Sequence, residues 1–317
     1  MAVPSVARPR TLPRRAFSGL GWRRARWGYV FIAPWIIGFV AFTALPMVAT
    51  FVFTFTNVNL TQAEPLRFVG LKNYETLLHD QQAWDALGVT LKFAALALPV
   101  AVVLPFLFAL MLHSRHLKGS GVFRVLIFLP YVVPFVAGVF IWQGMLNQDT
   151  GWINLFLEAI GIRNAPAWLE DPSWVYPGLV IMGLWGIGAG VIVYMAGLKG
   201  IPTDLYEAAR MDGANAWQSL RNITIPMMTP VIFYTIVLGV VDVLQYFLVP
   251  LVLHNGTGEP GGSTMFYNLY LYKNFFTFQN MSYGATLAWL LFAISLAVTL
   301  ILFGTARRWV YYAGEAR

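Results

Sequence analysis

Three residues with hydrogen-bonding side chains, Asp242, Gln245 and Tyr246, interrupt the apolar stretch LGVVDVLQYFLVP. An ionisable side chain inside a membrane-spanning segment is a functional candidate by default. If the stretch is helical, Gln245 and Tyr246 follow Asp242 at i+3 and i+4 and share its face. The carboxylate can bind paired hydroxyl groups of a polar solute, hold a coupling proton or sodium ion, or accept a structural hydrogen bond from a neighbouring helix. We treat the three residues as candidates for a solute path.

Two aromatic residues upstream, Trp185 and Tyr194, are further candidates for this path. An aromatic ring can stack on the flat apolar face of a solute, and the indole N–H and phenol O–H can form hydrogen bonds with it. The same side chains also serve as interfacial anchors or contact lipid. Both roles remain open at the level of sequence.

The sequence contains no group of residues that is typical of a catalytic or metal-binding site. The chain has no cysteine, which excludes thiolate ligands and disulfides. Glu170 and Asp171 are adjacent, so they cannot face each other across a sugar as a glycosidase pair does. No Gly-Lys pair is present, so the phosphate-binding loop of an ATPase is absent. We therefore expect no catalytic, cofactor or metal site in this chain, and we expect ATP and magnesium to bind a partner. The histidines are scattered: His79, His113, His116 and His254.

The composition indicates a protein whose main solvent is the bilayer. Hydrophobic residues make up 58% of the chain and charged residues only 11%, against about a quarter charged in a soluble domain. The net charge of +7 is concentrated partly in an N-terminal arm that precedes an apolar run, which suits an anionic membrane face rather than nucleic acid. The arginines of this arm are Arg8, Arg10, Arg14, Arg15, Arg23, Arg24 and Arg26.

Six apolar runs are long enough to cross a bilayer, because a spanning helix needs about 20 apolar residues. Prolines inside the runs, such as Pro130 and Pro134, predict kinks, and Gly186 and Gly190 predict a close packing face in the fourth run. We therefore predict an all-α membrane protein with six transmembrane helices. The runs lie at about 29–55, 88–112, 122–146, 174–198, 224–252 and 284–305.

The charges of the connections predict the orientation in the membrane. The N-terminal arm, the second and fourth connections and the C-terminal tail are basic, whereas the first and third connections carry mostly acidic residues. By the positive-inside rule, both termini are expected to be cytoplasmic. The predicted organisation is a basic cytoplasmic arm over 1–27, a six-span domain over 28–306 and a cytoplasmic tail over 307–317.

A polar island, EAARMDGANAWQSLRNITIP at Glu207–Pro226, separates the fourth and fifth apolar runs. Thr203 is a suitable N-cap for a helix here, and Asp204 and Glu207 fall in its early turns, where the helix dipole favours acids. Gly213 suits the left-handed residue that ends a helix. About ten residues would form a rod roughly 15 Å long. We expect this helix on the cytoplasmic side, where it either docks into another protein or lies at the membrane interface.

The island resembles the EAA motif of binding-protein-dependent ABC import permeases, E-A-A-x3-G-x9-I-x-L-P. Glu207, Ala208 and Ala209 are followed at the motif's spacing by Gly213 and by ITIP, where only the leucine is replaced, by isoleucine. The stretches FIAPWIIGFVAFTALPM, FVGLKNYETLL and NLYLYKNFFTFQNMSYGATLAW resemble sugar permeases of the maltose and glycerol-3-phosphate type, and the six-span form resembles the first of two such permeases. The outer loop HNGTGEPGGST follows the family's glycine-rich loop only loosely.

The resemblance implies a type I importer permease in the inner membrane of a bacterium or archaeon. It implies a second homologous permease, two copies of a cytoplasmic ABC ATPase and an extracytoplasmic solute-binding protein as partners. The other expected partners are membrane lipid and a carbohydrate substrate, and no nucleic acid is expected. The resemblance implies no enzymatic activity in this chain. The coupling loop would span about 199–226. The ATPase-coupling residues that the resemblance implies are Glu207, Ala208, Ala209, Asp212, Gly213 and Pro226.

The same resemblance places part of the solute site on the fifth span. Gln245 matches a frequent family glutamine, whereas Asp242 replaces a residue that is often small. We expect a neutral di- or oligosaccharide, because glycerol 3-phosphate would need several basic residues in the path and Lys92 alone is inadequate. A secondary sugar transporter with Asp242 as its coupling-ion site is the other alternative, although internal repeats would then be expected.

Overall fold

The described part of the computed structural model comprises residues 19–62, 64–114, 117–162 and 164–311. These residues form helices and loops, with one isolated bridge between Thr56 and Phe68, so the predicted all-α fold is confirmed. Most of the predicted basic arm lies outside the described residues, as do Arg115, His116, Arg163 and 312–317. The chain divides into two compact units, Met1–Val52 and Phe53–Arg317.

The first unit contains the first predicted span. Helix α1 (Gly19–Phe39) continues through a π-helical turn, η1 (Val40–Ala44), into α2 (Leu45–Phe53). Its apolar part, Arg26–Phe53, is long enough to cross a membrane, and none of its most apolar window is buried within the chain. A helix that is apolar on all sides and unburied is suited to lipid or to another membrane helix.

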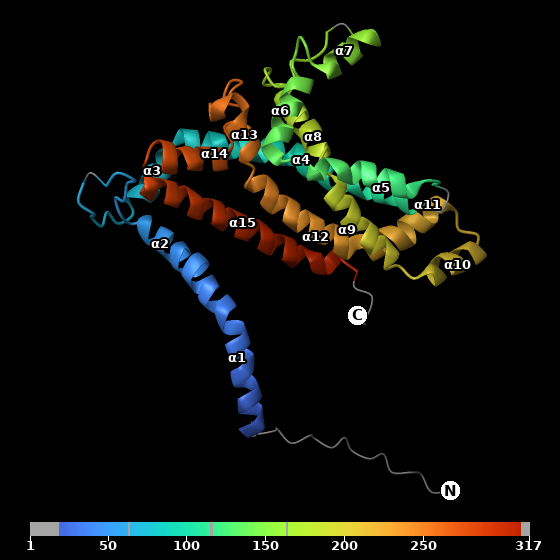
Figure 1. Ribbon diagram of the computed structural model, residues 1–317, viewed down its shortest axis with the longest axis horizontal. Helices are drawn as coiled ribbons and strands as arrows, with labels where there is room; N and C mark the ends of the chain where they lie inside the picture. Colours follow the sequence, from blue (N-terminus) through green and yellow to red (C-terminus); the bar gives the residue numbers. More distant parts are fainter. Residues whose placement is uncertain (1–18, 63, 115–116, 163, 312–317) are drawn as a thin grey trace. The chain divides into compact units, whose positions relative to one another are not determined.

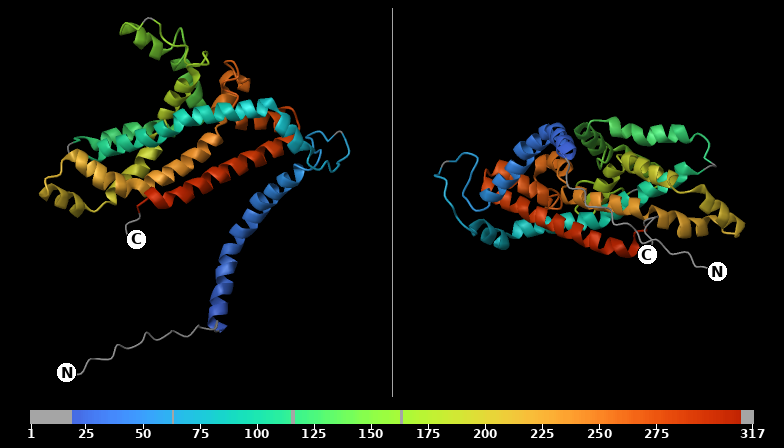
Figure 2. Two further views of the ribbon diagram at one scale, coloured as in Figure 1. Left: turned by 180° about the vertical axis from the view of Figure 1, so that it is seen from behind. Right: turned by 90° about the horizontal axis from the view of Figure 1, so that it is seen from below.

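The second unit is built around the long helix α4 (Gln81–His113), which packs against α9 (Gly188–Lys199) and α12 (Ile225–Leu244). The last helix, α15 (Met281–Trp309), packs against α12. Figure 1 shows α4, α12 and α15 running along one another, and the rear view in Figure 2 agrees. The second and sixth predicted spans are therefore uninterrupted helices.

The third and fourth predicted spans, at 122–146 and 174–198, are bent, and the bend in the third is the kink that Pro130 and Pro134 predict. In the third, α5 (Ser120–Phe128) and the 3-10 turn η2 (Leu129–Val132) meet α6 (Phe135–Met145) at 102°. The break falls before Pro134, which has no N–H to donate to a continuing helix. In the fourth, α8 (Val175–Leu184) meets α9 at 58°. Counting each bent pair as one span gives six spans within the described residues.

The fifth predicted span, 224–252, lies within a longer candidate span, Ala216–Gly256, which is interrupted after Leu244. Asn215 and Gln218 form a capping box at the start of α11 (Ala216–Ser219), which continues through the π-helical turn η3 (Leu220–Thr224) into α12. Pro226 follows this turn at the start of α12, where its missing N–H is accommodated by the irregular ladder. Helix α12 ends at Leu244, and a short helix α13 (Leu248–Val252) follows.

Close packing in the fourth span depends on Gly188 and Gly190. A Cβ atom at Gly188 would lie 2.6 Å from the carbonyl oxygen of Ile127, and one at Gly190 would lie 3.1 Å from Pro105. By contrast, Gly186 has no such close neighbour. The predicted packing role therefore holds for Gly190 and extends to Gly188, whereas no close packing is found at Gly186.

Three connections of the second unit fold into short helices, as is usual for loops of their length. They are α3 (Lys72–His79), α7 (Trp152–Ala159), and α14 (Tyr267–Tyr272), which continues into the π-helical turn η5 (Lys273–Thr277). The loop after α7 is held by buried Asn154, which accepts a hydrogen bond from the indole of Trp168 at 2.7 Å.

The carboxylate of Asp80 joins three helices, α4, α14 and α15. One carboxylate oxygen accepts hydrogen bonds from the backbone N–H groups of Gln82 and Ala83 and so caps α4. The other accepts from the hydroxyl of Tyr270 on α14 at 2.7 Å and from the hydroxyl of Tyr283 on α15. Burial, together with the Asp80 carboxylate, raises the pKa of Tyr270 to about 12, so its hydroxyl stays protonated and donates at neutral pH.

Replacing Asp80 with alanine is expected to lower the free energy of unfolding by about 2–4 kcal/mol. The variant loses a helix cap, worth about 1 kcal/mol. It also loses the one oxygen that both tyrosine hydroxyls share, which we count once as a hydrogen-bond acceptor with a charge, worth about 1.5–3 kcal/mol. The measurement is the change in melting temperature during thermal unfolding of the detergent-purified protein. Asp85→Ala is the matched control, because Asp85 accepts one hydrogen bond, from the side chain of Gln81. Equal melting temperatures for both variants would contradict this role of Asp80.

Candidate functional site

The polar island forms the short helix predicted for it, α10 (Thr203–Met211). The N-cap residue is Pro202, and its side chain makes no capping hydrogen bond. Thr203 is therefore the first helical residue, which corrects its assignment as the N-cap. A proline is well suited to this boundary, because its fixed φ and missing N–H are compatible with a helix start.

Gly213 ends α10 in the predicted left-handed conformation, with φ of +78°. The N–H of Ala214 bonds the carbonyl of Ala209 at 2.8 Å, and the N–H of Gly213 bonds that of Arg210 at 3.0 Å. These bonds satisfy carbonyl groups that a helix end leaves free. Glycine adopts this conformation at little cost, so Gly213 sets the direction in which the chain leaves α10.

A side-chain bond ties α10 to the start of the fifth span. The hydroxyl groups of Tyr206 and Thr224 are 2.9 Å apart, and Thr224 is buried. Tyr206 also packs with Ile223 against a core that contains Leu198 and Ile201. A helix held at several points moves together with the element that holds it. Helix α10 is therefore mechanically joined to the long helix that begins at Ala216.

The rest of α10 faces outward. Glu207, Ala208, Asp212 and Gly213 are exposed, and Ala209 is half-buried. Glu207 and Arg210 line a groove of about 500 Å³ together with His113, Ser114 and Lys199 at the facing ends of α4 and α9, and Glu207 is its one acidic lining residue. Pro226 is half-buried at the start of α12. The predicted coupling residues thus form an exposed helix on a fixed support.

A second candidate site is a cavity of about 350 Å³ between α4, α8, α9 and α12. Asp242 and Tyr246 contribute its hydrogen-bonding side chains, and the other lining residues are apolar or glycine, with Gly183, Gly186 and Gly190 among them. The breaks in the fourth and fifth spans both border this cavity. Discontinuous membrane helices of this kind are typical of solute sites in transporters.

Asp242 is exposed to this cavity and is not engaged in a structural bond. Its carboxylate has no hydrogen bond and no ion pair with any described residue. In the described part of the structure, therefore, no neighbouring helix of the same chain donates a hydrogen bond to Asp242, as the structural alternative would require. A carboxylate that remains open can accept hydrogen bonds from a ligand.

An aromatic cluster adjoins Asp242. The ring of Phe93 on α4 lies 4.8 Å from that of Tyr246, 5.2 Å from Phe266 and 6.0 Å from Tyr176. Phe93 and Tyr246 both line the cavity. Phe93 is buried in the core, so the half-buried Tyr246 is the aromatic side chain that the cavity presents beside the open carboxylate.

Gln245 differs from Asp242 and Tyr246 in its surroundings. It directly follows the last residue of α12, and its N–H still bonds the carbonyl of Val241 at 3.0 Å. Gln245 is exposed and does not line the cavity, and its backbone carbonyl accepts a hydrogen bond from Asn268 at 3.0 Å. The cavity is therefore lined by Asp242 and Tyr246 without Gln245, whose contact with a solute stays a prediction.

Trp185 and Tyr194 also lie outside the cavity lining. Trp185 occupies the turn between α8 and α9, and its ring packs edge-on against Trp142 at 6.0 Å. Tyr194 is fully buried in the core, and its hydroxyl lies 2.6 Å from that of Thr235. The structure thus assigns packing contacts to both residues, and their contact with a solute stays a prediction.

Sequence reasoning did not single out Phe93, Tyr176 or Phe266. They are single aromatic residues from three separate parts of the chain, and their proximity depends on long-range packing. Trp142 was also missed: its indole N–H is buried and has no hydrogen-bond partner among the described residues. Within those residues no group of three or more His, Cys, Asp or Glu side chains could hold a metal ion.

The fold and the two sites define a membrane transport component. Residues 81–317 match the family described as "Binding-protein-dependent transport system inner membrane component". The chain belongs to this family, as the EAA motif indicated, and is a multi-pass protein of the inner membrane.

Individual relatives agree with this assignment. A probable ABC transporter permease, YesP of Bacillus subtilis, is 34% identical over 91% of this chain and 93% of its own. The trehalose/maltose transport system permease MalF of Thermococcus litoralis is 32% identical over 90% of this chain and 95% of its own. The relatives are thus permeases rather than enzymes.

A solved bacterial alginate ABC transporter, in complex with an alginate pentasaccharide-bound periplasmic protein, contains a chain of the same fold. The TM-score is 0.78 at 24% identity, and the match covers 92% of this chain and 98% of the other. The predicted permease fold is therefore confirmed.

Proposed function

We propose that this chain is a permease subunit of an ATP-driven carbohydrate importer and that it forms half of the translocation path. The observation that carries the substrate class is the open carboxylate of Asp242 beside the aromatic pair Phe93 and Tyr246 in one cavity. The names of relatives, trehalose/maltose permease among them, support the same class.

A neutral di- or oligosaccharide fits this cavity better than an anionic solute. Among the described residues, the lining contains one acidic side chain and no lysine or arginine. A phosphate group would meet the Asp242 carboxylate without a compensating cation, which is unfavourable in a low-dielectric site. The glycerol 3-phosphate alternative is therefore disfavoured, and the family assignment disfavours a secondary transporter.

The exposed face of α10 is proposed to dock into a cytoplasmic ABC ATPase. Its support is the combination of an outward-facing helix and a rigid connection through Tyr206 and Thr224. A second permease, two ATPase copies and an extracytoplasmic solute-binding protein complete the proposed complex. ATP and magnesium bind the ATPase, so no step of hydrolysis is assigned to this chain.

The proposal is tested by purifying the tagged chain from its native membrane and reconstituting the co-purified complex in liposomes. We expect an ABC ATPase, a second permease and ATP-dependent uptake of a labelled neutral oligosaccharide when the solute-binding protein is supplied. Uptake that is driven by an ion gradient without ATP would contradict the proposal. Preference for a phosphorylated solute would contradict the substrate class.

A further inference from the structure

A further groove, which shares Lys199 with the groove beside α10, lies between α5, α9 and the end of α4. Its volume is about 450 Å³, within the range of about 300–1,000 Å³ that is usual for ligand sites. Most of its wall is apolar, with contributions from Phe128, Val191, Ile192 and Met195. Two cationic side chains, Arg124 from α5 and Lys199 from α9, complete the lining.

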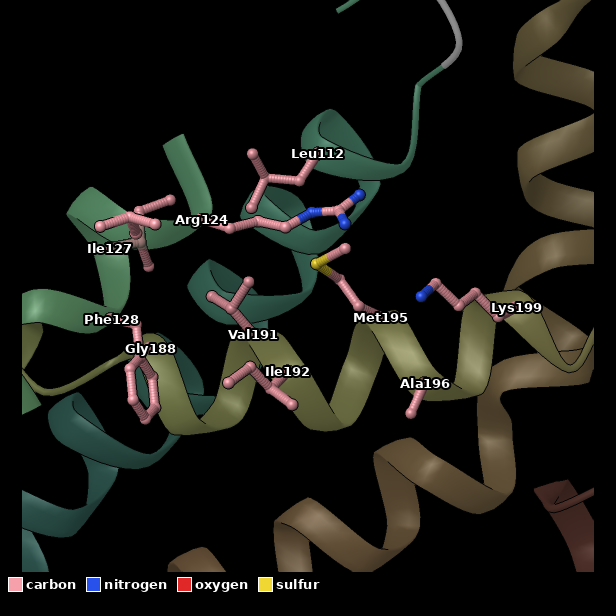
Figure 3. Close-up of a pocket in the computed structure, with 11 residues that line it drawn as sticks. Leu112, Arg124, Ile127, Phe128, Gly188, Val191, Ile192, Met195, Ala196 and Lys199 are labelled. Carbon is pink, nitrogen blue, oxygen red and sulfur yellow. The ribbon is translucent and has the colours of Figure 1, made fainter. Parts of the chain in front are cut away.

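The two cations lie at one end of the groove. Figure 3 shows the guanidinium of Arg124 and the ammonium of Lys199 near the Met195 side chain. Ile192 and Phe128, the last residue of α5, lie toward the N-terminal end of α9, near Gly188. Lys199 also lines the groove beside Glu207 and Arg210. The charged end is therefore the end of the bundle that carries α10, for which the charge pattern predicts the cytoplasmic side.

Neither cation is neutralised within the described part of the chain. The one ion pair found there joins His254 and Glu170, and no hydrogen bond is formed by the side chain of Arg124 or of Lys199. Two unpaired cations at the edge of an apolar groove attract an anion that has an apolar extension. Basic pockets between membrane helices on the cytoplasmic side bind anionic lipid head groups.

We propose that this groove binds an anionic phospholipid, with its phosphate between Arg124 and Lys199 and an acyl chain along Phe128 and Ile192. The groove suits such an amphipathic molecule because its polar and apolar parts are separated along its length. Free phosphate would leave the apolar wall unfilled. A purely apolar segment of another protein would leave both charges without a counter-ion, at a desolvation cost.

The test uses the full-length chain in the complex with which it co-purifies, placed in phosphatidylcholine nanodiscs. A photoactivatable phosphatidylglycerol is added, and crosslinked peptides are mapped by mass spectrometry. We expect crosslinks on α5 and α9. Arg124→Gln and Lys199→Gln together should lower their yield roughly thirtyfold, because each charge contributes about 1 kcal/mol, or about fivefold. Lys118→Gln is the matched control, since Lys118 is exposed near α5 but does not line the groove.

Ile192→Trp provides a second variant, which fills the apolar part and keeps both charges. It should also lower the crosslinking yield, whereas an unchanged yield would overturn the proposal. Equal crosslinking by a photoactivatable phosphatidylcholine would show that the charges do not select the lipid and would overturn it as well. A third contradicting result is protection of α5 and α9 by a partner polypeptide. The readout is lipid binding, so it is independent of whether the chain transports a carbohydrate.

Discussion

Replacing Glu207 with arginine is expected to reduce ATP-driven uptake at least tenfold while the protein remains inserted in the membrane. Glu207 is exposed on α10 and is the one acidic residue that lines the groove shared with Lys199 and Arg210. With arginine at this position, every charged described residue that lines the groove would be basic. Like charges that share one groove repel one another. It also reverses the charge that α10 presents to the proposed ATPase. The measurement is uptake and solute-stimulated ATP hydrolysis in proteoliposomes.

Asp204→Arg is the control for this reversal. Asp204 is an exposed acid on the same helix, but it does not line the groove. Its substitution is expected to cost only the favourable interaction with the helix dipole, about 0.3–1 kcal/mol. If both reversals abolished transport equally, Glu207 would have no specific role. Full transport by Glu207→Arg would exclude it from coupling.

The geometry of the coupling helix is probed at Gly213. Proline fixes φ near −65°, whereas Gly213 has φ of +78°, so Gly213→Pro must redirect the chain after α10. Asparagine tolerates the left-handed conformation better than other residues with side chains, and no atom would contact a Cβ at this position within 4 Å. Gly213→Asn should therefore retain coupling that Gly213→Pro loses. Equal transport by the two variants would separate this turn from coupling.

Replacing Asp242 with alanine is expected to raise the solute concentration for half-maximal uptake by roughly tenfold or more. A hydrogen bond to a charged acceptor contributes about 1.5–3 kcal/mol, and Asp242 supplies the one carboxylate of the cavity. The loss should be largest at low concentration of the loaded binding protein. The measurement is the concentration dependence of uptake, normalised to the amount of complex in the membrane.

Two further variants separate a solute contact from a structural role of Asp242. Asp242→Asn keeps the size and part of the hydrogen-bonding capacity, so it should fall between alanine and the unchanged protein. Gln245→Ala should change uptake little, because Gln245 does not line the cavity. Unchanged kinetics in Asp242→Ala, or a larger effect at Gln245, would remove Asp242 from the solute path.

The two proposed sites are connected through irregular helix segments. Helix α12 of the fifth span follows the π-helical turn η3 at its α10 end, and it ends at Leu244 beside the cavity. Hinges in proteins are often a few residues at the ends of elements that absorb large backbone changes. This arrangement offers a direct mechanical path from the proposed ATPase contact to the residues around Asp242.

Local features of this protein were determined by the sequence alone. Apolar runs, basic connections and the spacing of Glu207 to Gly213 predicted the all-α class, the family and the short helix α10. Gly213 was predicted in its left-handed conformation because helix termination depends on neighbouring backbone groups. These features depend on contacts within a few residues or on length and hydropathy, so the order of residues is sufficient to predict them.

Only the tertiary structure decided which residues share a site. A regular helix through 224–252 placed Gln245 and Tyr246 with Asp242, but the cavity is lined by Asp242 and Tyr246 together with Phe93 and without Gln245. Asp80 likewise receives hydroxyl groups 190 and 203 residues away. Where a helix breaks, and which distant side chains then meet, depends on packing between elements. Helical periodicity contains no information about such contacts, because it describes each helix without its neighbours.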